Sequence, residues 1–194
     1  MGIYQCSVEN TEQQPQQDTE EQVQPVSPMM DDKIRVLIKT GSYENIYHDK
    51  IVMKGQRGLY IETKQNLQEL SPDEEFTITS NEWKQGSVTI YPKADGRIEL
   101  PNVGRSEAVS YRGSMTCYGT PQGLVLVNEL PVEEYLYGVV PSEMPSSYSL
   151  EALKAQAVCA RSYAYNQIKS GKYAEYGADV DDSVACQVYN NIPE

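Results

Sequence analysis

VNELPVEEYLYGVVPSEMPSSYSLEALKAQAVCARSYAY, residues 127–165, is the stretch that decides the fold, and it ends in the strongest helix pattern of the chain. At its centre, Glu143 lies within Pro141-Ser-Glu-Met-Pro145, with a proline two residues to either side. Each proline fixes its own φ angle, and Pro145 also disfavours the helical conformation for Met144. The pattern therefore predicts that Glu143 lies on a stiff, non-helical link.

The helix that follows is predicted from its ends. Ser149 suits an N-cap, Glu151 lies in the first turn, Lys169 lies in the last turn, and Gly171 follows as a stop signal. These signals predict a helix over residues 150–170, roughly 30 Å long at about 1.5 Å per residue. A shorter helix over residues 132–137, ending at Gly138, is predicted before the Glu143 link.

Apolar residues recur along one face of the long helix at spacings of three and four, and small residues line an adjoining flank. The face comprises Leu153, Ala157, Ala160, Ala164 and Ile168, and the flank comprises Ala152, Ala155 and Cys159. So slim a helix is expected to pack closely against a partner element. Cys159 on this flank is predicted to be a buried thiol.

Short strand patterns, separated by turn residues, fill the chain before the helices. They cover residues 34–39, 46–52, 58–62, 75–79, 87–91, 98–100, 111–118 and 123–127. Asp95-Gly96 and Gln122-Gly123 resemble hairpin turns. The predicted fold class is α+β: a disordered tether over residues 1–30, a β-rich region over 31–127, and a helical catalytic region with one long helix over 128–194.

The composition and charge of the chain limit the classes of function that it can have. The first 30 residues are rich in Gln, Glu and Pro and cannot bury enough apolar surface to offset their ordering entropy, which predicts the tether. The formal net charge of −12 argues against nucleic acid as a partner, because a phosphate backbone calls for a basic stripe. The sequence shows neither a signal peptide nor a membrane span.

Three runs carry a resemblance to a known family: VNELPVEEY at 127–135, GVVPSEMP at 138–145 and EALKAQAVCARSY at 151–163. They closely resemble stage II sporulation protein D and the related amidase-enhancer domains, and the Cys-Gln-Val-Tyr run at 186–189 is similar to the same family. The resemblance implies a lytic transglycosylase that cleaves peptidoglycan glycan strands. It implies that Glu143 is the essential acid and that a cell-wall amidase is a partner.

The chemistry can be argued apart from the family. Glycoside cleavage ordinarily needs two carboxyl groups, one as acid and one as base or nucleophile. A lytic transglycosylase needs only one, because the 6-hydroxyl of the muramyl residue attacks its own anomeric carbon. Glu143 would protonate the leaving oxygen and then take the proton of the 6-hydroxyl. Partial desolvation of the Glu143 carboxylate by Val139, Val140 and Met144 is expected to favour this role. The alternative is that Glu143 is an ordinary solvated carboxylate in a loop.

Further candidates for substrate binding are Arg161, Tyr163, Ser162, Gln156, Gln187, Tyr189 and Tyr148. Arg161 is unusual on a small, apolar helix and needs a partner, either a carboxylate such as Asp181 or Asp182 or a group of the substrate. Tyrosine presents an apolar face with a polar tip, which suits stacking on sugars, and the alternative for any single Tyr is core packing. If the helix exposes them to solvent, Gln156, Ser162, Tyr163 and Gln187 are no longer candidates for substrate binding.

No metal or cofactor is predicted. Some relatives hold zinc near residue 186, but Ala185 precedes Cys186 here and the single histidine, His48, is distant. Cys6, Cys117, Cys159 and Cys186 lack the close spacing of a tetrahedral zinc site. One or two disulfides are the other use of four cysteines.

Family members are usually exported and often membrane-anchored, so the resemblance implies an extracytoplasmic, cell-wall-facing protein. The start at Met1-Gly2 then suggests a chain cut just after an anchor; a cytoplasmic protein is the alternative. Similar proteins continue past the Gln-x-Tyr motif, which predicts a C-terminus that is truncated or naturally short. A non-catalytic enhancer, binding glycan or the amidase, is the alternative function.

Overall fold

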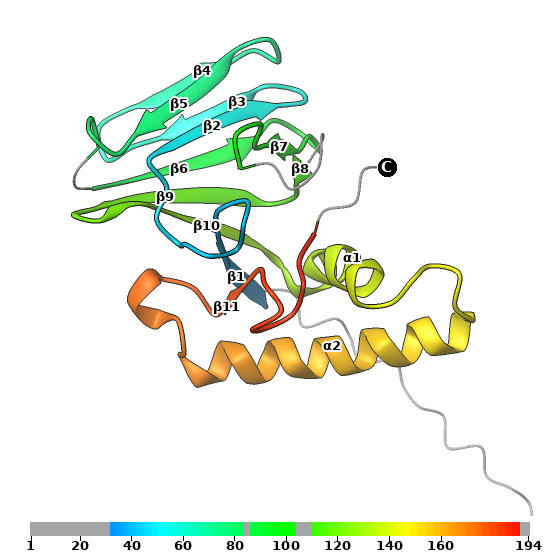
Figure 1. The fold of residues 1–194 in the computed structure, drawn as a ribbon. Coiled ribbons are helices and arrows are strands. Elements are labelled where there is room, and N and C mark those ends of the chain that lie inside the picture. Colours follow the sequence, from blue (N-terminus) through cyan, green and yellow to red (C-terminus); the bar gives the residue numbers. More distant parts are fainter. Residues whose placement is uncertain (1–31, 84–85, 104–109, 191–194) are drawn as a thin grey trace, which may run out of the picture. The chain divides into compact units, whose positions relative to one another are not determined.

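The computed structural model describes residues 32–83, 86–103 and 110–190 (Figure 1). These residues belong to one compact unit, Asp31–Glu194. The tether predicted over residues 1–30 lies outside the described residues, and so does Cys6. The described part mixes strands and helices and is mostly β, so the prediction of both kinds of element is confirmed.

Seven strands form the larger sheet, in the order β11-β1-β10-β9-β6-β3-β4. Their bounds are β1 Lys33–Ile38, β3 Leu59–Glu62, β4 Leu67–Leu70, β6 Gly86–Pro92, β9 Ser114–Thr120, β10 Gly123–Pro131 and β11 Val180–Asp181. All neighbours pair antiparallel except β1 and β11, which are parallel. The inner strand β10, with the sequence GLVLVNELP, is buried on both faces over its first six residues, as its nearly continuous apolar run indicates.

Four strands form the smaller sheet, in the order β5-β2-β7-β8. Their bounds are β2 Lys50–Gly55, β5 Glu75–Thr79, β7 Ile98–Glu99 and β8 Ser110–Tyr111. The hairpin predicted at Gln122-Gly123 is confirmed, because β9 and β10 pair directly across Thr120 and Gly123. The hairpin predicted at Asp95-Gly96 is wrong, since β6 and β7, which flank it, belong to different sheets.

The first helix, α1, spans Val132–Glu143 and corrects the prediction for Glu143. Glu143 is the last helical residue and not part of a non-helical link. Pro141 lies in the last turn, where its missing N–H removes a single helical hydrogen bond, so the helix continues through it. Met144 is extended, with φ −140° and ψ 125°, as the residue before Pro145 was expected to be.

The second helix, α2, spans Leu150–Ser170, and both predicted ends are confirmed. The Ser149 hydroxyl accepts a hydrogen bond from the Ala152 N–H at 3.3 Å, and Gly171 ends the helix with a left-handed φ of 65°. The predicted inner face is only partly buried, since Ala160 and Ala164 alone are fully enclosed. Cys159 is exposed and not a buried thiol, because α2 packs on one side only.

After α2, a 3₁₀ turn, η1 at Ala174–Tyr176, returns the chain to β11. The strand β11 was not predicted, and neither was β4; the strand predicted over residues 46–52 begins only at Lys50. No helix in the described part of the chain combines the length and the apolar composition needed to cross a membrane.

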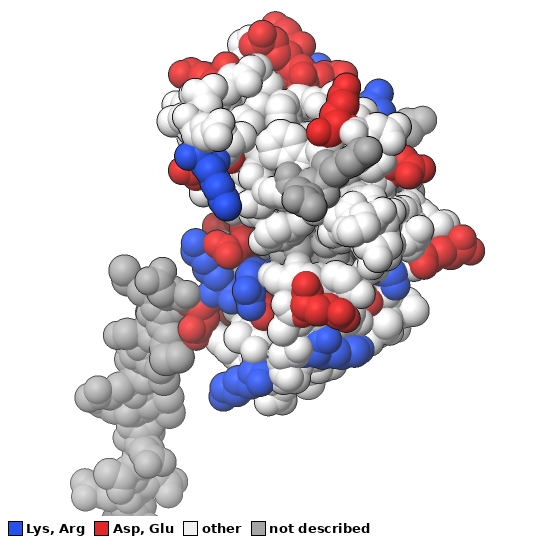
Figure 2. All heavy atoms as spheres, turned by 90° about the vertical axis from the view of Figure 1, so that its left-hand side faces the viewer, with Lys and Arg blue, Asp and Glu red and all other residues white. Residues whose placement is uncertain are grey.

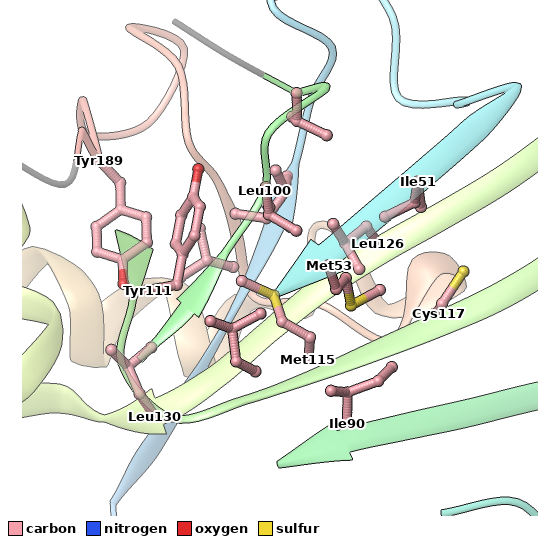
Figure 3. Close-up of a cluster of buried hydrophobic side chains, with 14 of the residues drawn as sticks. Ile51, Met53, Ile90, Leu100, Tyr111, Met115, Cys117, Leu126, Leu130 and Tyr189 are labelled. Carbon is pink, nitrogen blue, oxygen red and sulfur yellow. The ribbon is translucent and has the colours of Figure 1, made fainter. Parts of the chain in front are cut away.

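The main core lies between the two sheets and continues beneath α1 (Figure 3). Ile51 and Met53 of the smaller sheet belong to the same buried cluster as Met115 and Leu126 of the larger one. At one end of the cluster lie three buried tyrosine rings, those of Tyr111, Tyr135 and Tyr189. The Tyr189 ring centroid is 6.0 Å from that of Tyr111 and 5.1 Å from that of Tyr135, so the C-terminal segment is anchored in the core.

Candidate active site

Glu143 lies at the C-terminal end of α1, beside the segment that follows β11 (Figure 1). Its side chain is exposed, and its Oε1 atom accepts a hydrogen bond from the backbone N–H of Val188 at 2.7 Å. Within the described part of the chain, the Oε2 atom has no protein hydrogen-bond partner. The carboxylate is thus oriented through one oxygen, while the other can meet a ligand.

The structure does not show the desolvation that was predicted for the Glu143 carboxylate. Val139 is fully buried in the core and Val140 only half-buried, whereas the Glu143 side chain is exposed. The apolar residues on α1 face the core, so they do not enclose the carboxylate.

Hydrogen bonds tie the segment around Val188 to the end of α1. The Ser142 hydroxyl donates to the Gly138 carbonyl at 2.6 Å, lies 3.1 Å from the Asn190 carbonyl and accepts from the Asn190 N–H at 3.3 Å. The residue next to Glu143 therefore joins the helix to the segment that orients the Glu143 carboxylate.

A third part of the chain holds this segment from the other side. The Tyr43 hydroxyl donates to the Asn190 side-chain oxygen at 2.5 Å. Tyr43 lies in the loop between β1 and β2 and has a left-handed backbone, with φ 61°. A bulky residue is rare in that conformation, and residues held in it cluster at functional sites. The signal that could have pointed to Tyr43 is its backbone angle, which a sequence does not show.

Tyr189 and Gln187, predicted to bind substrate, have buried side chains. The Tyr189 hydroxyl donates to the Asn128 side-chain oxygen at 2.9 Å, and the Tyr135 hydroxyl donates to the Gln187 side-chain oxygen at 3.3 Å. Burial raises the pKa of Tyr135 far above its ordinary value, so this hydroxyl remains a donor. Both side chains fix the segment from inside the core, and substrate binding by either of them stays a prediction.

Arg161 pairs with Glu133 of α1 and not with Asp181 or Asp182. Its Nε and Nη2 atoms lie 2.6 and 2.8 Å from the two Glu133 carboxylate oxygens. This bidentate pair lowers the pKa of Glu133 and raises that of Arg161, chiefly through the hydrogen bonds. The arginine therefore braces α2 against α1, which was the structural alternative to substrate binding.

The other candidates on and before α2 differ in how far their side chains are exposed. Ser162 is exposed, and its hydroxyl donates a hydrogen bond to the Val158 carbonyl at 2.9 Å. Its exposure removes Ser162 as a candidate for substrate binding. Gln156 and Tyr163 are half-buried, and burial raises the pKa of Tyr163 to about 12. Tyr148 is 56% exposed, in the turn between Glu143 and α2. Tyr148 is thus the candidate whose ring is most open to a ligand.

Buried aspartates hold the last segment, two of them by hydrogen bonds to β1 and to Lys39 just after it. Asp179 accepts hydrogen bonds from the Arg35 side chain at 2.8 and 3.2 Å, and Asp182 accepts from the Lys39 backbone N–H at 3.2 and 3.3 Å. Asp181 accepts from the Ser183 and Tyr173 hydroxyls at 2.7 and 2.8 Å. Although burial opposes the change, these bonds lower the pKa of Asp181.

The cysteines of the described part are unpaired: Cys117 is buried, Cys186 is half-buried and Cys159 is exposed. Burial raises the pKa of Cys117 to about 12, so it stays a protonated thiol. Across residues 32–83, 86–103 and 110–190, no group of three or more His, Cys, Asp or Glu side chains is arranged to hold a metal ion.

Fold and site together define a β-rich domain in which one exposed, oriented glutamate ends a helix. The sequence model of the family described as Stage II sporulation protein matches residues 120–194, the part of the chain that carries this glutamate. Over that segment the chain is similar to stage II sporulation protein D and to the amidase enhancers.

Individual relatives agree with this assignment. Stage II sporulation protein D of Bacillus subtilis is 33% identical over 111 residues, which are 53% of this chain and 32% of that protein. The amidase enhancer of Bacillus subtilis is 52% identical over 54 residues, 28% of this chain and 6% of that protein. An uncharacterized protein of Brachyspira hyodysenteriae is 42% identical over 83 residues, 42% of this chain and 22% of that protein.

The chain thus spans a third or less of the length of these curated relatives. No solved structure matches it.

Proposed function

We propose that this protein is a lytic transglycosylase that cleaves peptidoglycan glycan strands, with Glu143 as its general acid and base. The observation that carries the proposal is the placement of the Glu143 carboxylate. One oxygen is oriented by the Val188 N–H at 2.7 Å, and the side chain is open to a polymer too large to enter a closed pocket. The relatives named stage II sporulation protein D support a role at the cell wall.

A single carboxyl group is sufficient for this reaction. Glu143, protonated at the start, gives its proton to the glycosidic oxygen as the bond from that oxygen to the anomeric carbon breaks. The 6-hydroxyl of the same muramyl residue then bonds to the anomeric carbon, and its proton passes to the Glu143 carboxylate. The products are a 1,6-anhydromuramyl end and a new sugar hydroxyl, and the enzyme is returned to its starting state.

The proposed substrate is a glycan strand stripped of stem peptides, and the proposed place of action is outside the membrane, where that polymer lies. Tyr148 is the proposed stacking surface next to the acid, because its ring is 56% exposed only five residues from Glu143. Gln156 and Tyr163 are proposed as secondary contacts. A cell-wall amidase, which removes the stem peptides, is the proposed partner.

A second candidate function is supported by a specific observation. Glu143 is exposed and not enclosed at the base of a cleft, and two exposed apolar side chains, Tyr148 and Leu150, follow it closely. An exposed apolar patch beside a polar group is typical of a binding surface. The alternative is therefore a non-catalytic enhancer that binds glycan or the amidase itself.

Mass analysis of products separates the two candidates. Peptide-free strands are incubated with the unmodified chain, with Glu143→Gln, and with Glu75→Gln as a matched control on an exposed strand residue of the smaller sheet. The amide of Glu143→Gln keeps an oxygen for the Val188 N–H but cannot donate the proton. We expect 1,6-anhydro ends from the unmodified chain and the control, and none from Glu143→Gln.

Anhydro products from Glu143→Gln at the unmodified rate would remove Glu143 from the reaction. An absence of products from all three proteins, with strand binding intact, would instead support the enhancer.

A further inference from the structure

The outer face of the larger sheet, which is turned away from the main core, is covered at one end and open at the other. On β1 and β10, the outward side chains of Leu37, Val125 and Val127 are buried in a second apolar cluster. Tyr47 and Tyr173, from segments outside the sheet, pack against this cluster. The open end is formed by β6, β3 and β4, and β3 lies four strands from β1, roughly 19 Å at about 4.8 Å per strand.

Two exposed tyrosines form the centre of the open end. Tyr60 of β3 and Tyr91 of β6 are directly opposite in the antiparallel pairing, so their side chains lie on the same face. The two side chains are 38% and 40% exposed, while the neighbouring Leu59, Ile61 and Ile90 point into the core. The outward residues around the two rings are Glu62, Leu67, Glu69, Thr89, Ser114 and Thr116.

Charged neighbours restrain both rings. The Tyr91 hydroxyl donates to the Glu62 carboxylate at 3.0 Å. The Lys93 ammonium lies 5.4 Å from the Tyr60 ring centroid and is itself paired with Glu69. A side chain that is already held loses little rotamer freedom when a ligand packs on it. The two rings are therefore preorganised for stacking.

Hydrogen-bonding groups continue the surface beside the rings. Thr89 and Thr116 are directly opposite on β6 and β9, with their hydroxyl oxygens 3.3 Å apart. Tyr91 and Ser114 also line a hollow of about 760 Å³. Hydroxyl groups both donate and accept hydrogen bonds, as those of sugars do. A ligand that stacks on the rings can thus bond to the strand next to them and extend into the hollow.

The charge of this surface favours an uncharged ligand. The charged side chains in the ring contacts are two carboxylates and one ammonium, those of Glu62, Glu69 and Lys93. The chain as a whole has a net charge of −12, and on the face shown in Figure 2 charged side chains occur in small groups between wide uncharged areas. Such a protein repels a polyanion. Sugar chains without charge, with apolar ring faces and many hydroxyl groups, meet all three requirements of the surface.

We propose that the outer face of β3 and β6 is a second glycan-binding surface, separate from Glu143, which stacks uncharged sugar rings on Tyr60 and Tyr91. A strand held at this surface has a raised effective concentration at any other site of the same protein. The choice of a glycan strand as the natural ligand rests on the proposed function. The surface itself takes no part in the chemistry at Glu143.

An NMR titration locates the binding site directly. Isotope-labelled protein in the Glu143→Gln background, which prevents cleavage, is titrated with the hexamer of N-acetylglucosamine. We expect the amide signals of residues 59–62 and 88–92 to shift, whether or not signals near residue 143 shift as well. Shifts confined to residues 140–150 and 186–190 overturn the proposal, and so does the absence of shifts at millimolar hexamer.

Removal of the rings tests their role. The variant Tyr60→Val with Tyr91→Val keeps a strong strand former at both positions. We expect the affinity at this surface, read from the Thr89 and Thr116 amide signals, to fall about tenfold. Tyr91→Phe keeps the ring and most of the affinity. The matched control is Tyr137→Leu, which removes an exposed ring from α1 and leaves the affinity unchanged.

The competing explanation is that the two rings only stabilise the sheet through their cross-strand contact. Urea unfolding of the same variants separates the two roles. A double variant that is less stable but titrates with the hexamer like the unmodified protein overturns the proposal. If the double variant fails to fold, Tyr60→Val and Tyr91→Val are each titrated alone, and unchanged affinity in both has the same meaning.

The outcome is independent of catalysis. If the hexamer shifts the signals of β3 and β6 while the unmodified chain produces no anhydro ends, the surface stands and the transglycosylase proposal falls. Anhydro ends without shifts in β3 and β6 lead to the opposite conclusion.

Discussion

The Tyr43 hydroxyl contacts the segment that orients Glu143. It fixes Asn190, whose backbone is bonded to Ser142, and the Val188 N–H two residues earlier orients the Glu143 carboxylate. A left-handed backbone at a tyrosine has an energetic cost, which surrounding contacts must offset. We therefore expect Tyr43 to be a positioning residue, since its hydroxyl is linked to Glu143 through the intervening segment.

We expect Tyr43→Phe to lower turnover in the anhydro-product assay by about fivefold, with little change in KM. A fivefold change corresponds to about 1 kcal/mol, the usual contribution of one hydrogen bond. The ring and its packing remain, and the hydrogen bond to Asn190 is removed. Tyr137→Phe, on an exposed ring of α1, is the control and keeps its turnover. Equal turnover of Tyr43→Phe and the unmodified chain would show that the bond does not position the acid.

At the scale of the element, α2 is a helix whose ends are locally determined and whose sides are sparsely packed. Its N-cap bond and left-handed C-terminal glycine are short-range features, while Ala160 and Ala164 alone are fully buried along its 21 residues. Its attachment to α1 includes the bidentate pair of Arg161 and Glu133. With so little buried surface, the caps contribute a large share of its stability.

We expect Ser149→Ala to lower the free energy of unfolding by about 1 kcal/mol, because the Ala152 N–H loses its side-chain acceptor. Urea unfolding followed by far-UV circular dichroism measures this. Ser147→Ala, an exposed serine in the same turn, is the control and should change the free energy by less than about 0.5 kcal/mol. A loss of the same size in both variants would mean that the cap bond contributes nothing.

At the scale of the whole molecule, the chain after α2 returns to the sheet and completes the site. The parallel strand β11 joins β1, and buried aspartates hold the segment that continues to Val188 and Asn190. The pKa of Asp181 is lowered in the folded state by its hydrogen bonds to Ser183 and Tyr173. A lowered folded pKa stabilises the fold above the unfolded pKa and loses that effect as the pH falls through the folded value.

We therefore expect the unmodified protein to lose stability as the pH falls below about 4, the ordinary value for Asp. Asp181→Asn should unfold with a free energy lower by about 1 to 3 kcal/mol at pH 7, and the gap to the unmodified protein should narrow below pH 4. Urea unfolding across pH 3 to 7 measures this, with the exposed Asp73→Asn as the control. A gap that is constant across this range would assign the loss to packing and not to charge.

Features that rest on short-range chemistry could be predicted from the amino-acid sequence alone. Ser149, Gly171 and the 3.6-residue pattern between them predicted both ends of α2, and short strand patterns separated by turn residues predicted most of the strands. The Ser-Glu-Met-Pro motif also singled out Glu143. Each of these signals acts within a few residues, so the sequence contains it in full.

The surroundings of Glu143 depend on the tertiary structure, which brings distant parts of the chain together. It continued α1 through Pro141, paired Arg161 with Glu133, exposed Cys159 and buried Tyr189 and Gln187. It also brought Tyr43 and Val188, 145 residues apart in the sequence, to the same end of α1. The physical reason is that burial and pairing depend on which elements meet across the core, and local propensity is a weak influence beside that packing.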